Sequence, residues 1–482
     1  MKPPNKAERS AAEAVEGRGR LEGNSLEQAK VRTQSRGVLP PSLQRVNEVA
    51  KRDRRCRFTA LLHHVDEAAL RRAFSRQKRS ASAGVDGETV ASYELALEGN
   101  LQDLCERVHT GRYRPQPVRR VHLSKPDGGT RPIGVPVLED KIVQGAVAEV
   151  LSAIYEADFL GFSYGFRPGR GQHNALDALT VGLRRKVSWV LDADIRGYYD
   201  AIDHGWLLRF LEHRIADRRI LRLIRKWLNA GVLEDGELTK SLVGTPQGAT
   251  VSPLLSNVYL HYVFDLWANQ WRKRHARGDV IIVRYADDFV VGFQHKADAV
   301  RFHADLRDRF RRFHLELHPE KTRLIEFGRF AAENRKRRGA GKPETFTFLG
   351  FTHKCGRTHQ GKFLVMRHTA KKRLRATLQA VKLALRRRMH EPLPEQGAWL
   401  RSVVRGYFGY HAVPTNVRTL ERFRTEVTRY WLRTLRRRSQ KSRITWERMK
   451  RIADRWLPRP QILHPWPEQR FHARTRGRSP VR

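Results

Sequence analysis

The sequence is poor in cysteine, and it has no long apolar run. Its three cysteines, Cys56, Cys105 and Cys355, are isolated from one another. They exclude a structural zinc site built from cysteine pairs and favour a reducing, cytoplasmic compartment. No stretch approaches the ~20 apolar residues of a membrane-spanning helix. Residues 1–20 mix acids with bases and lack an apolar core, which argues against a signal peptide.

Acidic residues are too few to balance the basic ones. The 482 residues include 94 Lys and Arg against 50 Asp and Glu, which gives a formal net charge of +44. A folded protein tolerates such self-repulsion best when a polyanion neutralises it, and nucleic acid fits better than an anionic membrane surface. Since 40% of the residues are hydrophobic, the chain can build two or three domains with cores of their own.

The patterns along the chain predict an ordered series of regions. Residues 1–40 are polar and Gly-rich, as is typical of a disordered tail, and 41–117 show helical spacing of apolar residues. Strands and helices alternate over 118–352. A second helical and strongly basic region covers 368–440, and a basic tail covers 441–482.

Within the second helical region, one buried helix face is predicted. Its apolar residues recur at steps of four, three and four: Leu374, Leu378, Val381 and Leu385. The basic run 386–388 extends the opposite side of the same helix. Such arginines are either a solvated face or contacts to a nucleic acid, and the sequence leaves both interpretations open.

The segment 279–293, DVIIVRYADDFVVGF, predicts a β-hairpin. Two apolar, β-branched runs flank Tyr285-Ala286-Asp287-Asp288, so two adjacent carboxylates lie at the turn. These carboxylates repel each other, and a cation in front of them would relieve the repulsion.

A third carboxylate comes from the segment 189–203, WVLDADIRGYYDAID. Residues 189–195 are predicted to form a strand in which Asp192 and Asp194 share one face, because side chains alternate with period two. Three carboxylates side by side suit divalent cations such as Mg²⁺, which take oxygen ligands. Two such ions ~4 Å apart can activate a 3′-hydroxyl and stabilise a leaving pyrophosphate. An Asp-Asp pair alone is more often an exposed turn, but its combination with this strand is far more specific.

These two segments resemble the palm of reverse transcriptases, and more closely the group II intron reverse transcriptase/maturase family. The resemblance covers nearly the whole chain from about residue 36. Further segments match the family in order: SAGVDGETVASY (82–93), LSKPDGGTRPIGVPVLEDKIVQGAV (123–147), FSYGFRPGRGQHNAL (162–176), GTPQGATVSPLLSNVYLH (244–261), LELHPEKTRLIEF (315–327) and FTFLGFTH (346–353).

The resemblance implies an α+β right-hand polymerase, with fingers and a palm that carries the catalytic β-hairpin, followed by an α-helical thumb that is the maturase domain. It implies an RNA-directed DNA polymerase using two Mg²⁺ ions, with Mn²⁺ as a substitute. The expected partners are the group II intron RNA, an RNA template with a DNA primer, target DNA and dNTPs, and no membrane. Many relatives carry an HNH nuclease domain, but no paired cysteines for one occur here, so an endonuclease activity is not expected.

The same resemblance assigns the catalytic and metal-binding roles to Asp194, Asp287 and Asp288. Asp194 is chosen over Asp192 because the family places an aromatic residue five positions after the catalytic Asp. That aromatic residue is Tyr199, whose bulk would oppose a 2′-hydroxyl on the incoming nucleotide. Asp192 is expected to be a neighbour that tunes the site.

Phosphate and template contacts are expected from four other residues. Lys125 and Arg131 flank the PDGG turn and would reach the triphosphate, Arg as a bidentate partner and Lys as a point charge. Gln247 would contact the templating pair or the nucleotide. Lys321 is either a general acid for pyrophosphate or a phosphate contact.

The maturase-like region carries the expected RNA-binding residues, Arg386, Arg387 and Arg388. A helical basic surface suits double-helical RNA, which proteins recognise mainly through its shape, phosphates and 2′-hydroxyls. The basic tail 441–482 matches the family's DNA-binding segment in position, so the resemblance implies DNA binding there.

Three alternatives compete with an intron-encoded reverse transcriptase that is also a maturase. The first is the reverse transcriptase of a retron, a diversity-generating element or a CRISPR locus, and the long maturase-like thumb argues against the first two. The second is a splicing-only cofactor, which the intact Asp194, Tyr199, Asp287 and Asp288 disfavour. The third is a non-enzymatic basic protein, which explains the charge but none of the motifs. The host intron, the DNA target and the formation of a homodimer stay open.

Overall fold

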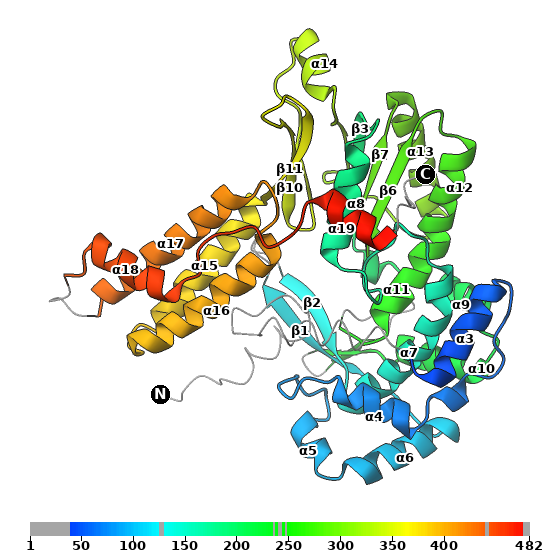
Figure 1. Ribbon diagram of the computed structural model, residues 1–482. Coiled ribbons are helices and arrows are strands. Elements are labelled where there is room, and N and C mark those ends of the chain that lie inside the picture. Colours follow the sequence, from blue (N-terminus) through cyan, green and yellow to red (C-terminus); the bar gives the residue numbers. More distant parts are fainter. Residues whose placement is uncertain are drawn as a thin grey trace.

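The fold is α+β, as the sequence predicts. The computed structural model describes residues 39–124, 130–234, 237–239, 243–245, 248–438 and 443–475 (Figure 1). The predicted disordered tail therefore lies outside the described residues up to residue 38. No helix among the described residues is long and apolar enough to cross a membrane.

The N-terminal part is helical, in agreement with the prediction for 41–117. Its α-helices are α3 (Pro41–Arg52), α4 (Glu67–Ser75), α5 (Val90–Glu94) and α6 (Leu97–His109). The Asp66 side chain accepts from the Ala69 amide, and this cap fixes the start of α4. These helices share a core with the 21-residue helix α7 (Leu138–Asp158).

A small sheet is formed by two strands that precede α7 along the chain and two that follow it. Its strands are β1 (Val118–Ser124), β2 (Thr130–Val135), β4 (Val232–Glu234) and β5 (Glu237–Thr239), in the order β2-β1-β4-β5. β1 and β2 pair antiparallel, with Ser124 opposite Thr130.

The central sheet has the order β6-β7-β3-β8. Its strands are β3 (Trp189–Ala193), β6 (Val280–Tyr285), β7 (Asp288–Phe293) and β8 (Arg323–Glu326). One face packs on α8 (Gln172–Leu183), and the other joins the main core with α13 (Lys296–Arg311). Because both faces are covered, Val280–Val283 of β6 and Phe289–Phe293 of β7 have no polar side chains.

Further helices contribute to the main core: α9 (His204–Glu212), α10 (Arg218–Leu228), α11 (Ser252–Leu260) and α12 (Leu266–Arg274). A π-helical turn, His261–Asp265, joins α11 to α12. Such turns are rare and frequently occur at functional sites. Here the turn carries a buried carboxylate, that of Asp265.

A three-stranded sheet leads out of the central region. It has the order β11-β10-β9, with β9 (Phe346–Phe348), β10 (Phe351–Arg357) and β11 (Phe363–Thr369). The short helix α14 (Ala331–Arg337) precedes it. β10 continues past the predicted region end at 352, and β11 reaches one residue beyond the predicted start at 368.

A helical lobe follows and projects to the left in Figure 1. We call it the helical lobe: α15 (Lys371–Arg387), α16 (Leu393–His411), α17 (Val417–Arg436) and α18 (Trp446–Trp456). The predicted apolar face of α15 is confirmed, since Leu374, Leu378, Val381 and Leu385 are all buried in the core of this lobe.

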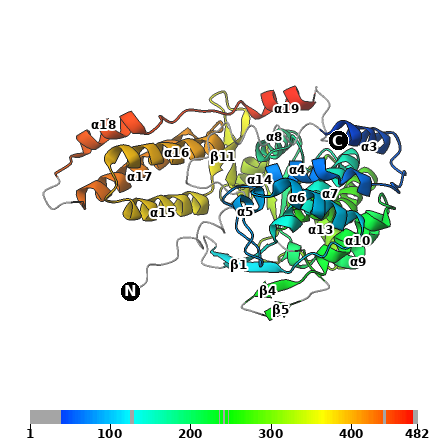
Figure 2. The ribbon, with the colours of Figure 1, turned by 90° about the horizontal axis from the view of Figure 1, so that it is seen from below.

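The chain then returns from the helical lobe to the central sheet. We call residues 457–475 the return segment; it ends in α19 (Pro467–Thr475), which lies against α8 in Figures 1 and 2. Arg470 Nε lies 2.6 Å from the buried carboxylate of Asp177 on α8, which also pairs with Arg367 at 2.9 Å. Phe471 is buried in the core on the α8 face of the central sheet. Much of the predicted basic tail is therefore packed on protein.

Candidate active site

The hairpin predicted over 279–293 is confirmed. β6 and β7 pair up to Tyr285 opposite Asp288, so Ala286 and Asp287 form a two-residue turn. Ala286 has a φ of 58°. The left-handed backbone at this position is what a tight hairpin turn of this kind requires, so surrounding contacts must hold it.

Those contacts centre on Arg284, the residue that precedes Tyr285. Its side chain is fully buried, and its Nη2 lies 2.6 Å from the carboxylate of Asp265, which is also fully buried. The same guanidinium donates to the Ala286 carbonyl at 2.9 Å, to Asn257 Oδ1 at 2.9 Å and to Ser163 Oγ at 2.8 Å. The network joins the turn to α11 and to the π-helical turn, and so fixes its position.

The sequence analysis does not identify this network. Arg284 stands inside an otherwise apolar strand, and a charge in such a place must be paired when it is buried. An arginine in this position therefore indicates a buried partner of opposite charge. Its partner, Asp265, is 19 positions away on a helix and cannot be found from periodicity.

The segment FSYGF lies against the same turn. A Cβ built on Gly165 would come within 2.2 Å of the Ala286 nitrogen, so only glycine permits this approach. The Gly165 carbonyl accepts from Asn257 Nδ2 at 2.7 Å. This motif bonds to the edge of β6 that faces away from β7, through a bridge between Ser163 and Arg284, and so supports the turn from that side.

Asp194 follows the last residue of β3, and the strand register brings it to the hairpin. β3 ends at Ala193, two residues before the predicted end, and Ala193 pairs with Phe289 of β7. Asp194 directly follows Ala193 and Asp288 directly precedes Phe289, so this register brings the two aspartates to the same end of the sheet. Its own carbonyl accepts from the His318 amide at 2.8 Å, which holds the backbone at this point.

The carboxylate of Asp194 lies against Lys321, with 2.8 Å between Oδ2 and Nζ. The lysine side chain is 63% exposed, and the aspartate side chain is 29% exposed. An ion pair this open to solvent contributes ~0–1 kcal/mol. Lys321 can therefore turn away when another cation takes the carboxylate.

Asp192 faces a different base. Its Oδ2 lies 3.6 Å from a guanidinium nitrogen of Arg323. Burial raises the pKa of Asp192 to about 6, although Arg323 opposes this shift. The position is compatible with the expected role of a neighbour to Asp194.

Tyr199 lies in the 3₁₀ turn η2 (Tyr198–Asp200) that follows β3, and its side chain is half-buried. Its ring meets that of Tyr198 edge-on, with centroids 5.4 Å apart. The Tyr199 carbonyl accepts from the Thr245 amide at 2.8 Å. The structure thus brings Gly244 and Thr245, the first two residues of the GTPQG motif, beside Tyr199. Gln247 lies outside the described residues.

The other predicted contacts lie in less described or more distant parts of the chain. Lys125 falls outside the described residues, and Arg131 is described only as a backbone position of β2, opposite Leu123. Arg386 and Arg387 are exposed at the end of α15. Arg388 follows the helix, lies 3.0 Å from Glu391 and covers the Trp399 ring at 5.1 Å.

Three carboxylates thus reach one end of the central sheet, and hard oxygen donors of this kind suit Mg²⁺. Across the described residues, no three His, Cys, Asp or Glu side chains are drawn together as a ligand set. Asp194 instead faces Lys321 through a weak, exposed pair. By donor type and backbone position, the residues fit a divalent cation.

Comparison with known proteins agrees with this geometry. The family described as reverse transcriptase (RNA-dependent DNA polymerase) matches residues 123–353. Protein YkfC of Escherichia coli is 34% identical over 258 residues, which cover 46% of this chain and 67% of that protein. The group II intron-encoded protein LtrA of Lactococcus lactis is 37% identical over 188 residues, 38% of this chain and 30% of that protein. Nuclear intron maturase 1 of Arabidopsis thaliana is 28% identical over 93 residues, 19% of this chain and 13% of that protein.

The matched region, which contains the carboxylates at this end of the central sheet, defines one class, the reverse transcriptases. Within that class, the chain belongs to the group II intron reverse transcriptase/maturase family. The aligned stretches cover less than a third of LtrA, so what LtrA does as a whole protein is not transferred by the alignment alone.

Proposed function

We propose that this chain is an RNA-directed DNA polymerase with maturase activity. It would bind its group II intron RNA to promote splicing and copy that RNA into DNA during retrohoming. One observation carries the proposal: Asp194 and the Asp287-Asp288 turn meet at one end of the central sheet, where a buried arginine network holds the turn.

In this proposal the central sheet is the palm and the small sheet belongs to the fingers. The helical lobe is the thumb and the maturase domain. The basic residues that remain exposed on the lobe, Arg386 and Arg387 among them, would face the intron RNA. Arg388 would act mainly by packing, because it is held between Glu391 and Trp399.

Asp194, Asp287 and Asp288 would hold two Mg²⁺ ions, for which Mn²⁺ can substitute. When bound, such ions activate a 3′-hydroxyl and neutralise the charge that develops on the pyrophosphate. Lys321 would leave Asp194 at little energetic cost and lie near the phosphates, either as their contact or as a proton donor to the leaving group.

The remaining residues would select and position the nucleotide. Tyr199, steadied by Tyr198, would present its ring where a ribonucleotide carries a 2′-hydroxyl and so favour dNTPs. Gln247, two residues after Thr245, would approach the templating pair. Lys125 and Arg131 would bind the triphosphate.

The test is Asp287→Asn in the full-length chain. We expect cDNA synthesis from an RNA template and a DNA primer to be lost, because one oxygen ligand loses its charge, while RNA affinity changes little. Asp308→Asn is the matched control, since Asp308 is an exposed acid on α13 that pairs with Arg311 on the same helix. Primer extension by Asp287→Asn at a near wild-type rate would refute the assignment.

A further inference from the structure

Between β8 and β9 the chain leaves the central sheet and forms a basic projection. We call residues 328–345 the basic knob; α14 is its helix, and it stands at the top of Figure 1. The knob contains six Lys and Arg but only two Glu. It is thus more basic, for its length, than the chain as a whole.

Both acidic residues of the knob are already paired. Glu344 lies 3.7 Å from Arg335, and Glu333 lies 2.9 Å from Arg357 on β10. Arg338 pairs with Glu326 of β8. Four exposed bases have no carboxylate partner among the described side chains: Arg329, Lys336, Arg337 and Lys342.

An aromatic ring is exposed among these bases. Phe330 immediately precedes α14, and 52% of its surface is accessible. Exposed rings next to arginine and lysine are the usual means by which proteins hold single-stranded nucleic acids, because the bases stack on the rings while the cations contact the phosphates.

The base of the knob is held rigidly. Gly328 has a φ of 153°, and a Cβ there would lie 2.0 Å from the Val187 carbonyl oxygen, so the chain passes directly over the start of β3. The Phe327 amide donates to the Ser188 carbonyl at 3.0 Å. Phe330 and its neighbouring bases are therefore presented on a fixed platform, which lowers the entropy lost on binding.

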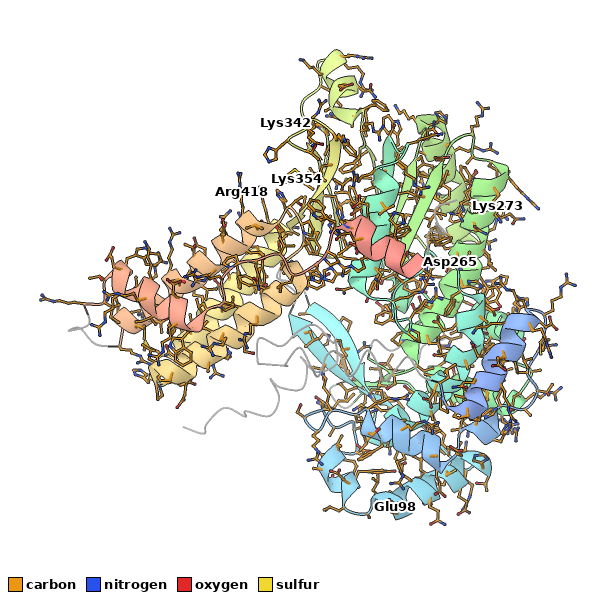
Figure 3. All side chains as sticks on the ribbon, viewed as in Figure 1. Glu98, Asp265, Lys273, Lys342, Lys354 and Arg418 are labelled. Carbon is orange, nitrogen blue, oxygen red and sulfur yellow. The ribbon has the colours of Figure 1, made fainter. Side chains whose placement is uncertain are left out.

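The knob is separate from the candidate active site. Glu326 pairs with Trp189 at the start of β3, whereas Asp194 follows the end of that strand. Five residues of strand separate the two ends by ~17 Å at ~3.3 Å per residue. In Figure 3, Lys342 of the knob, Lys354 of β10 and Arg418 of α17 follow one edge of the molecule towards the helical lobe.

We propose that the basic knob is a binding site for single-stranded RNA, with Phe330 stacking on an unpaired base and Lys336, Arg337 and Lys342 contacting the phosphates. Duplex RNA is disfavoured because its bases are already stacked and offer no face to the ring. The choice of RNA over DNA rests on the proposed function; the site itself does not depend on polymerase activity.

The experiment uses the full-length chain and an RNA oligonucleotide of about 12 nucleotides, within the usual site size for single strands. One uridine carries a photoreactive iodine, and the crosslinked peptide is identified by mass spectrometry. We expect the crosslink at Phe330 or its neighbours. Phe330→Leu should remove it and weaken binding about fivefold or more, whereas Phe330→Tyr keeps the ring and should retain both.

The charge contribution is tested with the triple change Lys336→Gln, Arg337→Gln and Lys342→Gln. Three lost phosphate contacts should reduce the slope of log affinity against log salt by ~2 for a single strand. The matched control neutralises three exposed bases elsewhere: Lys273, Arg277 and Arg307. Lys273 lies on the opposite side of the molecule in Figure 3. The control should leave the slope unchanged.

Primer extension on a pre-annealed template and primer keeps this proposal distinguishable from the polymerase assignment. Loss of the crosslink in Phe330→Leu and a salt slope reduced by ~2 in the triple variant, both with normal primer extension, support the knob as a separate RNA site. The proposal is overturned if no crosslink reaches the knob, if Phe330→Leu binds like the wild type, or if the control has an equal effect. The proposal is also overturned if the knob binds single-stranded DNA or duplex RNA more tightly than single-stranded RNA.

Discussion

Replacing Arg284 by methionine tests how the hairpin turn is held. The change leaves the carboxylate of Asp265 fully buried without its guanidinium partner, which lies 2.6 Å away in the wild type. Removing one member of a buried ion pair costs ~3–5 kcal/mol, because an uncompensated charge remains in the interior. A typical domain has only ~5–15 kcal/mol of stability, so the loss should be readily measured by urea unfolding.

The double change Arg284→Met with Asp265→Leu separates stability from catalysis. Replacing both charges by apolar groups of similar volume is often neutral, so most of the stability should return. Recovery should be incomplete by ~1–3 kcal/mol, because Asn257 Oδ1 and the Ala286 carbonyl lose a buried donor. Since the turn is no longer tied to the guanidinium, cDNA synthesis should stay low.

Two measurements decide between this reasoning and a purely structural role. Urea unfolding gives the free energy of unfolding of both variants, and primer extension gives their rate of cDNA synthesis. If Arg284→Met loses less than ~1 kcal/mol, the pair is not the buried contact described here. If the double variant regains wild-type synthesis, Arg284 serves stability alone.

Two further predictions concern pH and splicing. Burial lowers the pKa of His353 and of His411 to about 3, so both stay neutral in the fold, and their stabilising contribution, complete above pH ~6.5, is lost as pH falls. His353→Phe should therefore reduce the fall in unfolding free energy between pH 6 and pH 5 by ~1.4 kcal/mol. The check is urea unfolding at both pH values, and a fall equal to that of the wild type would contradict the prediction. Charge reversal of Arg386 and Arg387 should slow intron splicing at low Mg²⁺, whereas Asp287→Asn should leave splicing intact. Both are measured on the isolated precursor RNA. If the arginine variant splices as fast as the wild type, these residues are only a solvated helix face.

The sequence predicts those parts of the site that local patterns describe. The hairpin with Asp287 and Asp288 follows from two apolar, β-branched runs around a turn. The shared face of the strand leading to Asp194 follows from a period of two residues, and the buried face of α15 from a period of 3.6. The pairing of Arg284 with Asp265 and the meeting of Asp194 with Lys321 do not, because they join residues 19 and 127 positions apart. Such contacts depend on the tertiary arrangement of several elements.

The C-terminal residues also show that local sequence patterns do not reveal tertiary contacts. Residues 441–482 have the composition of a basic tail, and nothing in their local pattern indicates docking on α8. The docking depends on one buried carboxylate, Asp177, which receives Arg367 from β11 and Arg470 from the return segment. A sequence pattern cannot reveal that two arginines from separate segments share one partner.

The return segment also bears on how the protein is made. Phe471 fills part of the core that the central sheet shares with α8, so that core stays incomplete until synthesis has reached residue 471. Domains usually fold in order as they leave the ribosome. Here the core of the central sheet cannot be completed before Phe471 is synthesised, and that residue follows the whole helical lobe in the chain. A ribosome that stops within the helical lobe would release a chain whose central sheet lacks the packing that Phe471 supplies, so truncated chains should fold less stably than the full-length chain.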